Sequence, residues 1–180
     1  MIYAFLAQGF EEIEAITVID VLRRAELEVI TVGVGDNLIR GSHGIIVAAD
    51  TQDNLIELNE KVDMIFLPGG MPGTLNLEKS AAVQSAIEYC LENDKYVAAI
   101  CAAPSILGHR GDLKGKKACC YPGFEGELDG ADVSDAPVVE DGKIITSRGP
   151  ATAMSLALKL VSVLTSDSRS KQLGASMICK

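Results

Sequence analysis

The sequence predicts an α/β protein, a three-layer α/β/α sandwich built around a mainly parallel sheet. Short apolar runs alternate along the chain with segments whose apolar residues recur at helical spacing. Stretches rich in glycine and proline separate these segments. Internal repeats, low-complexity tracts and linkers are not evident, so we expect a single domain over residues 1–180.

The elements follow from these patterns in chain order. Continuous apolar runs are typical of parallel strands, because helices cover both faces of such a sheet. We expect strands at residues 2–6, 29–34, 64–67, 97–100, 116–120 and 143–147. Helical spacing predicts helices at 13–24, 82–92, from 105 onward and 151–164, with a brief helical turn at 55–58. The remaining segments are a short antiparallel excursion at 38–48 and a connection rich in glycine and acidic residues at 123–142.

Composition narrows the class of protein. The 180 residues carry a formal net charge of −9, with acidic and basic side chains scattered rather than grouped in blocks. This pattern argues against a nucleic acid or an anionic membrane as partner. The N-terminus lacks a basic start, and no apolar run approaches the roughly 20 residues that span a bilayer. We therefore expect a soluble, cytoplasmic protein.

The five cysteines form no C-x-x-C pair, and neither histidine lies at metal-ligand spacing from a cysteine pair. We therefore expect neither a disulfide framework nor a metal site. Cys90 falls in an amphipathic helix and is predicted to be a core residue, while Cys179 lies near a loose C-terminus. Cys119 and Cys120 fall on a predicted strand, so one should point inward and one outward. A core residue beside an incidental thiol is favoured there over a resolving cysteine.

Cys101 is predicted to be the reactive residue. It directly follows the predicted strand at 97–100, and small residues after it open a helix. This places the cysteine on a strand-to-helix turn at the carboxyl edge of the sheet, where open α/β proteins position their chemistry. The N-terminus of the helix would favour the thiolate, the reactive form of cysteine.

Loops that leave neighbouring strands should bring other groups to Cys101. Glu14 lies among apolar residues after the first strand, so we expect it to be half-buried, with a raised pKa. It would hydrogen-bond a neighbouring sulfur or act as a general base. The N–H groups of Gly70 and Ala102 would form an oxyanion hole, although Gly69-Gly70 could equally form a simple tight turn. The neighbouring Glu11 and Glu12 are candidates for helix-capping charges.

Five motifs stand out along the chain: GFEEIE at 9–14, DVLRR at 20–24, LPGG at 67–70, AAICAAP at 98–104 and TSRGP at 146–150. Together they resemble the motifs of the ThiJ/PfpI superfamily, and in particular of its DJ-one branch. The fold of this superfamily is flavodoxin-like and related to class I glutamine amidotransferases. The resemblance covers roughly residues 1–165 and implies a flavodoxin-like sandwich that is usually a homodimer. The family's oxidation-prone nucleophilic cysteine maps onto Cys101, its partner glutamate onto Glu14, and its backbone donors onto Gly70 and Ala102.

The resemblance implies conversion of methylglyoxal to lactate or deglycation of glyoxal adducts, both without a cofactor, as part of stress protection. Our first hypothesis is therefore a cysteine enzyme of small reactive dicarbonyls. The alternative is a redox sensor or redox-regulated chaperone that works through oxidation of Cys101. A third interpretation, a glutamine amidotransferase or peptidase, would need a histidine beside Cys101.

Some positions depart from the family pattern. Tyr121 replaces the histidine that many relatives carry before a proline, so proton transfer would depend on Glu14. His43 stands where the branch often has an arginine, and it is either an anion-binding or a plain surface residue. His109 is expected to be a solvated surface residue. For Arg24 and Arg148, near the pocket rim or the dimer interface, we expect a structural or anion-steering role. The apolar segment 151–164 supports the homodimer.

Overall fold

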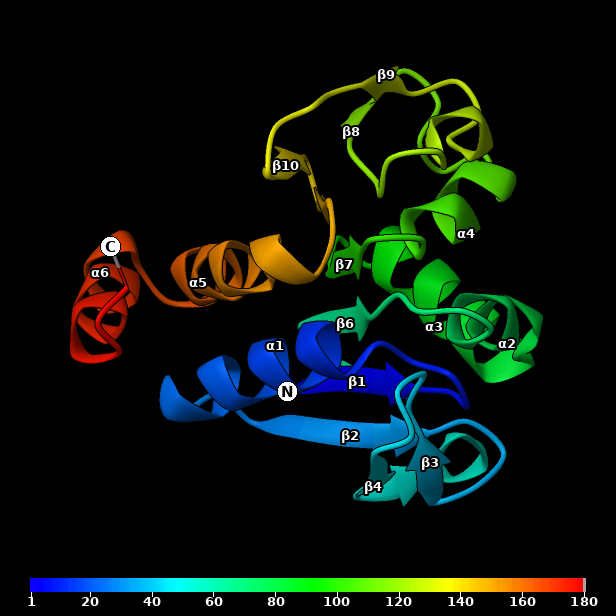
Figure 1. Cartoon of the computed structure of the whole chain (residues 1–180), viewed down its shortest axis with the longest axis horizontal. Helices are drawn as coiled ribbons and strands as arrows, with labels where there is room; N and C mark the ends of the chain where they lie inside the picture. The colour runs from blue at the N-terminus through cyan, green and yellow to red at the C-terminus, as the bar shows by residue number, and fades with distance from the viewer. Residues whose placement is uncertain (180) are drawn as a thin grey trace.

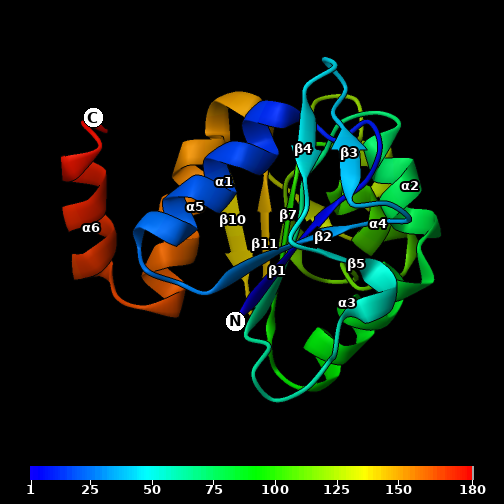
Figure 2. The same ribbon diagram turned by 90° about the horizontal axis from the view of Figure 1, so that it is seen from below.

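The computed structural model describes residues 1–179 and has a seven-stranded sheet covered by helices on both faces (Figures 1 and 2). The strand order is β10-β11-β7-β6-β1-β2-β5, and only the β10–β11 pair is antiparallel. The predicted α/β architecture with a mainly parallel sheet is thus confirmed. The strands of this sheet are β1 (Ile2–Leu6), β2 (Val29–Gly33), β5 (Thr51–Gln52), β6 (Met64–Leu67), β7 (Tyr96–Ile100), β10 (Val138–Asp141) and β11 (Ile144–Ser147).

Two hydrophobic layers lie on either side of the sheet, because successive strand residues point to opposite faces. In β1, Ile2, Ala4 and Leu6 pack in the layer of α1 and α5, whereas Tyr3 and Phe5 pack in the layer of α3 and α4. The helices are α1 (Glu12–Arg24), α2 (Gly73–Lys79), α3 (Ala81–Glu92), α4 (Pro104–His109), α5 (Ala153–Leu164) and α6 (Asp167–Ser176), with 3-10 turns η1 (Asp53–Leu55), η2 (Glu125–Glu127) and η3 (Pro150–Thr152). Among residues 1–179, no helix has the length and apolar character needed to cross a membrane.

Two pairs of short strands lie outside the main sheet. The predicted antiparallel excursion is an antiparallel pair, β3 (Leu38–Arg40) and β4 (Ile46–Ala48), hereafter the hairpin. The strand predicted at 116–120 is wrong in extent: β8 covers only Lys117–Ala118 and pairs with β9 (Asp132–Val133). The helical turn predicted at 55–58 lies instead at η1.

Cys119 and Cys120 are both buried, so the predicted alternation of one inward and one outward side chain is wrong. The cause is that the strand ends before them. The N–H of Cys119 donates to Thr146 Oγ1 at 2.9 Å, a side-chain acceptor rather than a neighbouring strand. Cys90 is buried in the core, as predicted.

Packing contacts within the chain account for the apolar residues of α5. Leu156 and Leu160 are fully buried in the layer that α5 shares with α1. The C-terminal helix α6, which the sequence analysis did not predict, packs on α5 through Leu173 and is capped by Ser166, whose Oγ accepts from the Arg169 N–H at 3.1 Å. The composition of α5 therefore gives little support to a dimer.

His109 links three elements rather than pointing freely into solvent as expected. Its Nδ1 lies 2.6 Å from Glu78 Oε1 in α2, and its Nε2 lies 2.8 Å from Glu127 Oε2 in η2. These two hydrogen bonds, Glu78 first and then Glu127, raise the pKa of His109 above its usual value. The charged imidazolium therefore ties the end of α4 to α2 and η2.

Replacing His109 with glutamine should destabilise the fold in a pH-dependent way. Because the folded pKa is raised, the imidazolium contributes stability fully below about pH 6.5, and this contribution is lost as the pH rises through the folded pKa. The side chain is partly exposed, so the effect should stay below about 1 kcal/mol. Urea denaturation of wild type and His109→Gln at pH 6 and pH 8.5 measures it. An equal difference at both pH values would contradict this interpretation.

Candidate active site

The predicted convergence of three loops at one sheet edge is observed. Strands β7, β6 and β1 are neighbours in the sheet and parallel, so their carboxyl ends lie together (Figure 1). The loop after β1 leads to Glu14 in the first turn of α1, the loop after β6 carries Gly69 and Gly70, and β7 ends directly before Cys101. The N–H of Glu11 donates to Gly69 O at 2.9 Å and joins the first two loops.

Cys101 is held in a strained turn. Its φ angle is +65°, in the left-handed region that costs a non-glycine residue on the order of 1–3 kcal/mol. The neighbouring chain fixes this conformation from both sides: the Cys101 N–H donates to Ser147 O at 2.9 Å, and its carbonyl accepts from the Tyr121 N–H at 2.8 Å. Strand β11 and the segment at Tyr121 therefore present the sulfur at the end of the sheet.

The sulfur receives backbone N–H groups from two loops. The N–H groups of Ala102 and Gly70 lie at it, and their role as an oxyanion hole stays a prediction. The predicted help from a helix N-terminus is weaker, because α4 begins only at Pro104 and is short. Burial raises the pKa of the Cys101 thiol, and the charge of Glu14 raises it further, outweighing the two N–H donors. Burial and the neighbouring charge of Glu14 therefore favour the neutral thiol.

Glu14 is the partner of the thiol. It is fully buried rather than half-buried, and its carboxyl group lies beside Cys101, since a Cβ on Gly69 would meet both groups. Its Oε2 accepts from the Gly69 N–H at 2.9 Å. Burial raises the pKa of Glu14 to about 7, with the hydrogen bonds to Cys101 and Gly69 opposing the shift. Because a charge on either group disfavours a charge on the other, the pair holds a proton that it can pass between oxygen and sulfur.

The second carboxylate oxygen of Glu14 lies toward Gly149. Its Oε1 is buried and has no hydrogen-bond partner among residues 1–179. A Cβ at Gly149 would lie 4.0 Å from this oxygen and 3.2 Å from the Tyr121 ring. Tyr121 and Gly149 also line a surface cavity of about 310 Å³ together with Pro122, Arg148 and residues 150–152. Tyr121 and Gly149 therefore lie between this cavity and the buried carboxyl group of Glu14.

Gly69 is required by the geometry of the pair, which the sequence analysis did not recognise. A Cβ on Gly69 would lie 2.6 Å from Cys101 Cβ and 2.7 Å from Glu14 Oε2, closer than real contacts allow. Its N–H is also the donor that holds Glu14. The two successive glycines after a buried strand were the available signal, but they fit a tight turn equally well.

The two candidate arginines, Arg148 and Arg24, do not belong to the Cys101–Glu14 pair. Arg148 lines the cavity. Its Nη1 donates to the backbone carbonyl of Asp135 at 3.2 Å and lies 3.5 Å from the Asp135 carboxylate. Arg24 forms an exposed ion pair with Asp20 one turn earlier in α1. The structural or anion-steering role expected for both arginines stays a prediction.

The acidic residues before Glu14 have different roles. Glu11 is the N-cap of α1, because its Oε2 accepts from the Glu14 N–H at 2.7 Å. Glu12 does not cap the helix but binds the hairpin, including His43. Both histidines contact carboxylates, and within residues 1–179 neither hydrogen-bonds with Cys101. The arrangement therefore lacks the cysteine–histidine pair of an amidotransferase or peptidase.

Sequence comparison places most of the chain in one family. The profile of the DJ-1/PfpI family matches residues 1–163. The chain is 34% identical over 176 residues to protein dj-1beta of Drosophila melanogaster, covering 96% of the chain and 94% of that protein. It is 30% identical over 172 residues to the glutathione-independent glyoxalase DJ-1 of Schizosaccharomyces pombe, covering 90% of both. The chain spans 40% of the length of Arabidopsis thaliana protein DJ-1 homolog B, to which it is 36% identical.

Solved structures agree closely with this fold. Toxoplasma gondii DJ-1 in an oxidized form superposes with a TM-score of 0.94 at 37% identity, covering 98% of this chain and 97% of that one. Drosophila melanogaster DJ-1beta superposes with a TM-score of 0.94 at 32% identity, covering 99% and 97%. The similarity thus extends over the sheet, both helical layers and the loops that carry Cys101 and Glu14.

Proposed function

Because the chain belongs to the DJ-1/PfpI family, we propose that it converts small dicarbonyls such as methylglyoxal to hydroxy acids without a cofactor, with Cys101 as nucleophile and Glu14 as acid and base. The observation that carries this proposal is the contact between the thiol of Cys101 and the buried carboxyl group of Glu14, beside the N–H groups of Gly70 and Ala102. A relative with 30% identity is named a glutathione-independent glyoxalase, which agrees with this chemistry.

The first step joins the thiol to the aldehyde carbon. Glu14 takes the thiol proton while the sulfur attacks, so a C–S bond forms and the carbonyl electron pair moves to oxygen. The N–H groups of Gly70 and Ala102 would stabilise this developing oxyanion. Glu14 then returns the proton to the oxygen, which gives a hemithioacetal on Cys101.

The second step moves a hydrogen between the two carbons. Glu14 removes the proton from the former aldehyde carbon and passes it to the oxygen of the neighbouring carbonyl group, which gives an enediol. Glu14 then takes the hydroxyl proton from the first carbon and delivers it to the second carbon. This leaves a lactate thioester, in which the first carbon is oxidised and the second reduced. Water then hydrolyses the thioester, so methylglyoxal and water together yield lactate and the free thiol. An external oxidant or reductant is not needed.

Lactate production tests the proposal. The freshly reduced protein, free of glutathione, is incubated with methylglyoxal and lactate is measured over time. We expect continuous lactate formation that stops when peroxide oxidises Cys101. Absence of lactate from folded, reduced protein would overturn the enzymatic proposal. A deglycase-type hydrolysis of glyoxal adducts uses the same pair and is measured in parallel.

The alternative function is redox sensing through Cys101. It is favoured by the unpartnered, buried Oε1 of Glu14 and by the two N–H groups at the sulfur, because these groups can bind the oxygens of a sulfinate. Mass spectrometry of peroxide-treated protein distinguishes the two functions. A sulfinate confined to Cys101, in a protein that never produces lactate, would favour the sensor.

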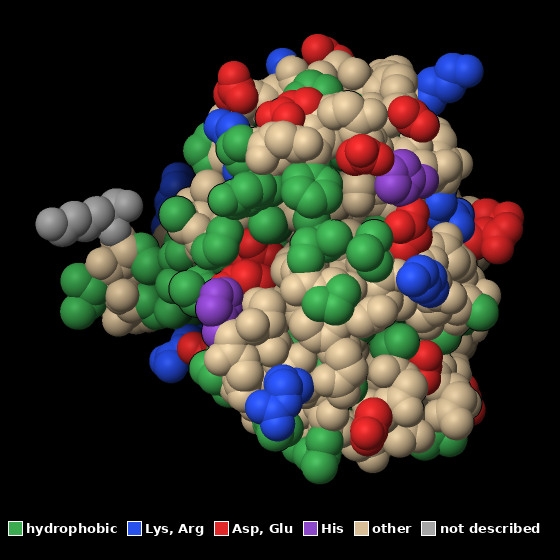
Figure 3. Space-filling model, turned by 45° about the vertical axis from the view of Figure 1, so that its right-hand side comes forward, with side chains coloured by type: hydrophobic (Ala, Val, Ile, Leu, Met, Phe, Trp, Pro, Cys, Tyr) green, Lys and Arg blue, Asp and Glu red, His purple; other side chains and the backbone are tan. Residues whose placement is uncertain are grey.

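We also propose that the protein is a homodimer. Ile13 and Ile16 of α1 are exposed beside Ile45 and Ile46 of the hairpin, which Glu12 joins to α1. Figure 3 shows hydrophobic side chains gathered on one face around a group of acidic side chains. An exposed apolar patch of this kind is typical of an interface.

Replacing Ile16 with glutamate should dissociate the dimer, because the introduced carboxylate would have to lose its hydration when the two chains associate. Light scattering should give about twice the 19.0 kDa chain mass for wild type and close to a single chain for Ile16→Glu. Lys159, in α5 and already paired with Glu140, offers a control position, and Lys159→Glu should keep the wild-type mass. A wild-type protein with the mass of one chain would contradict the proposed dimer.

A further inference from the structure

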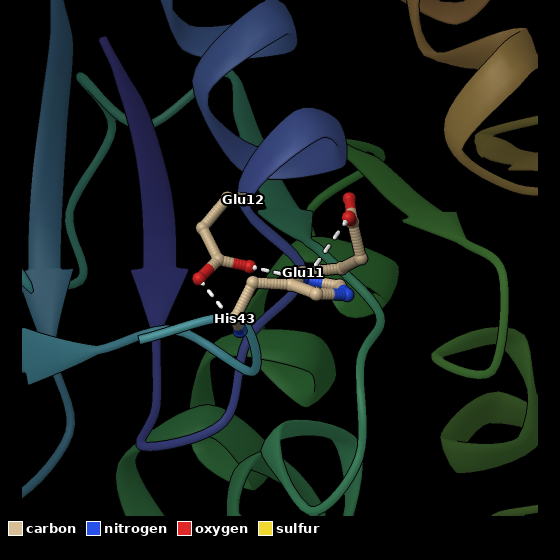
Figure 4. A group of neighbouring side chains, drawn as sticks. All are labelled: Glu11, Glu12 and His43. Atoms are coloured by element: carbon tan, nitrogen blue, oxygen red, sulfur yellow. Dashed lines mark hydrogen bonds and ion pairs between the residues drawn. The ribbon is translucent and has the colours of Figure 1, made fainter. Parts of the chain in front are cut away.

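Three potential metal ligands converge where α1 meets the hairpin. Glu11 and Glu12 stand at the start of α1, and His43 reaches toward them from the turn between β3 and β4 (Figure 4). His43 Nδ1 lies 3.0 Å from Glu12 Oε2 and 3.8 Å from Glu11 Oε1. All three atoms lie within 4.8 Å of one another, so a single ion placed among them can touch each.

The second histidine provides an internal comparison. His109 also contacts two glutamates, but Glu78 faces its Nδ1 and Glu127 faces its Nε2. The two nitrogens point away from each other across the ring, so no single ion can bind one of them together with both carboxylates. At His43 both carboxylates face the same nitrogen. The composition of the two clusters is identical, and only the His43 cluster has the geometry of a chelating site.

Glu11 has a carboxylate oxygen to spare. The residue is only 8% exposed, and its Oε2 accepts the Glu14 N–H. Among residues 1–179, its Oε1 receives no hydrogen bond and faces His43 Nδ1. This oxygen is therefore free to bind an ion beside the imidazole nitrogen.

Hydrogen bonds from the hairpin orient the Glu12 carboxylate toward His43 Nδ1. Its Oε1 accepts from the backbone N–H groups of His43 at 2.8 Å and Ile45 at 3.3 Å, which leaves Oε2 toward Nδ1. A Cβ on Gly41 would overlap the Glu12 carboxylate, so a larger residue there would displace this side chain. Such supporting hydrogen bonds orient metal ligands and strengthen binding.

We propose that Glu11, Glu12 and His43 bind a divalent transition-metal ion of the Zn²⁺ class. With ligand bonds of about 2.0–2.2 Å, tetrahedral Zn²⁺ separates its ligand atoms by about 3.4 Å, close to the distances at His43. Two carboxylates balance the charge of the ion, and the imidazole nitrogen favours Zn²⁺ over Mg²⁺ or Ca²⁺. His43 would turn its Nδ1 lone pair to the metal and give up its hydrogen bond to Glu12.

The fourth position of this ion would be open in the single chain, where the His43 side chain is 72% exposed. The ion would join α1 to the hairpin and remain separate from the sulfur of Cys101. Glu11 connects the two places, because its Oε2 caps the N–H of Glu14. The site therefore lies beside the Cys101–Glu14 pair but does not depend on its chemistry.

Calorimetric titration with Zn²⁺ tests the site. The parent protein carries Cys101→Ser and Cys179→Ser, which removes the two thiols that are not buried. We expect one Zn²⁺ per chain in this parent and in its His109→Gln derivative. The His43→Gln derivative should bind at least tenfold more weakly, since even loss of a supporting contact to a metal ligand costs about that much.

Glu11→Gln is the second variant. Its amide oxygen can still cap Glu14, and the loss of charge should weaken Zn²⁺ binding as strongly as His43→Gln does. Circular dichroism identifies any variant that fails to fold, in which case the other variant decides. A parent that binds no Zn²⁺, a folded His43 or Glu11 variant that binds as tightly as the parent, or an equal loss in His109→Gln would each overturn the proposal.

Discussion

Glu14→Gln is expected to lower lactate production by about 10²–10⁴-fold, the range that a general acid–base group contributes. The amide can accept the Gly69 N–H in place of the carboxylate, so the local packing should persist. It can neither take the Cys101 proton nor move hydrogen between the substrate carbons. The initial rate with methylglyoxal measures the effect. Glu88→Gln, at an exposed position on α3, is the matched control and should keep wild-type activity.

The stability of Glu14→Gln separates lost chemistry from lost fold. The folded pKa of Glu14 is about 7 against an ordinary value of 4.5, so the folded protein binds more protons between these values. The wild type therefore loses stability as the pH rises through 7, by about 3 kcal/mol. Glutamine does not ionise, and the variant should become the more stable protein at pH 8. A variant with wild-type activity, or one that gains no stability relative to wild type between pH 5 and pH 8, would contradict the role given to Glu14.

Gly69→Ala is the substitution with the second large expected effect, a loss of both activity and stability. The added methyl group would overlap Cys101 Cβ and Glu14 Oε2, so the pair must separate or the loop must move. Overpacking of this kind typically costs about 1–3 kcal/mol of stability, and a 1 Å displacement of catalytic groups lowers activity about 10²-fold. Lactate kinetics and urea denaturation of the same preparation measure both.

Gly126→Ala is the control for this substitution, because a Cβ at Gly126 meets no atom within 4 Å. Its φ angle also lies outside the left-handed region. This variant should keep wild-type activity and stability. If Gly69→Ala retained full activity, the close approach of Gly69 to the pair would have no catalytic importance.

The sheet and the central pair were predictable because their signals are local. Continuous apolar runs located the core strands, and parallel strands fixed which loops meet at one edge. Cys101 directly follows such a strand, and Glu14 stands in the helix after another. The full burial of Glu14 and the need for glycine at position 69 were not predictable, since both depend on contacts between loops far apart in sequence.

Other features of the structure have no sequence pattern from which they could be predicted. Strands β8 and β9 have two residues each, too few to show alternation, and α6 is polar on all but a narrow face. His43 and Glu12 are 31 positions apart, so metal-ligand spacing along the chain could not reveal them. The charge of His109 depends on two glutamates from separate elements, which composition alone cannot bring together.

The most direct test of the central claim is lactate formation from methylglyoxal by wild type, Cys101→Ser and Cys120→Ser, all freshly reduced. Removing a nucleophile should lower the rate by about 10³-fold or more. Cys120 is a buried thiol that the mechanism does not use, so Cys120→Ser should remain active. Lactate from wild type and Cys120→Ser but not from Cys101→Ser is the predicted result. Equal lactate from the Cys101→Ser protein, or none from folded wild type, would contradict the account.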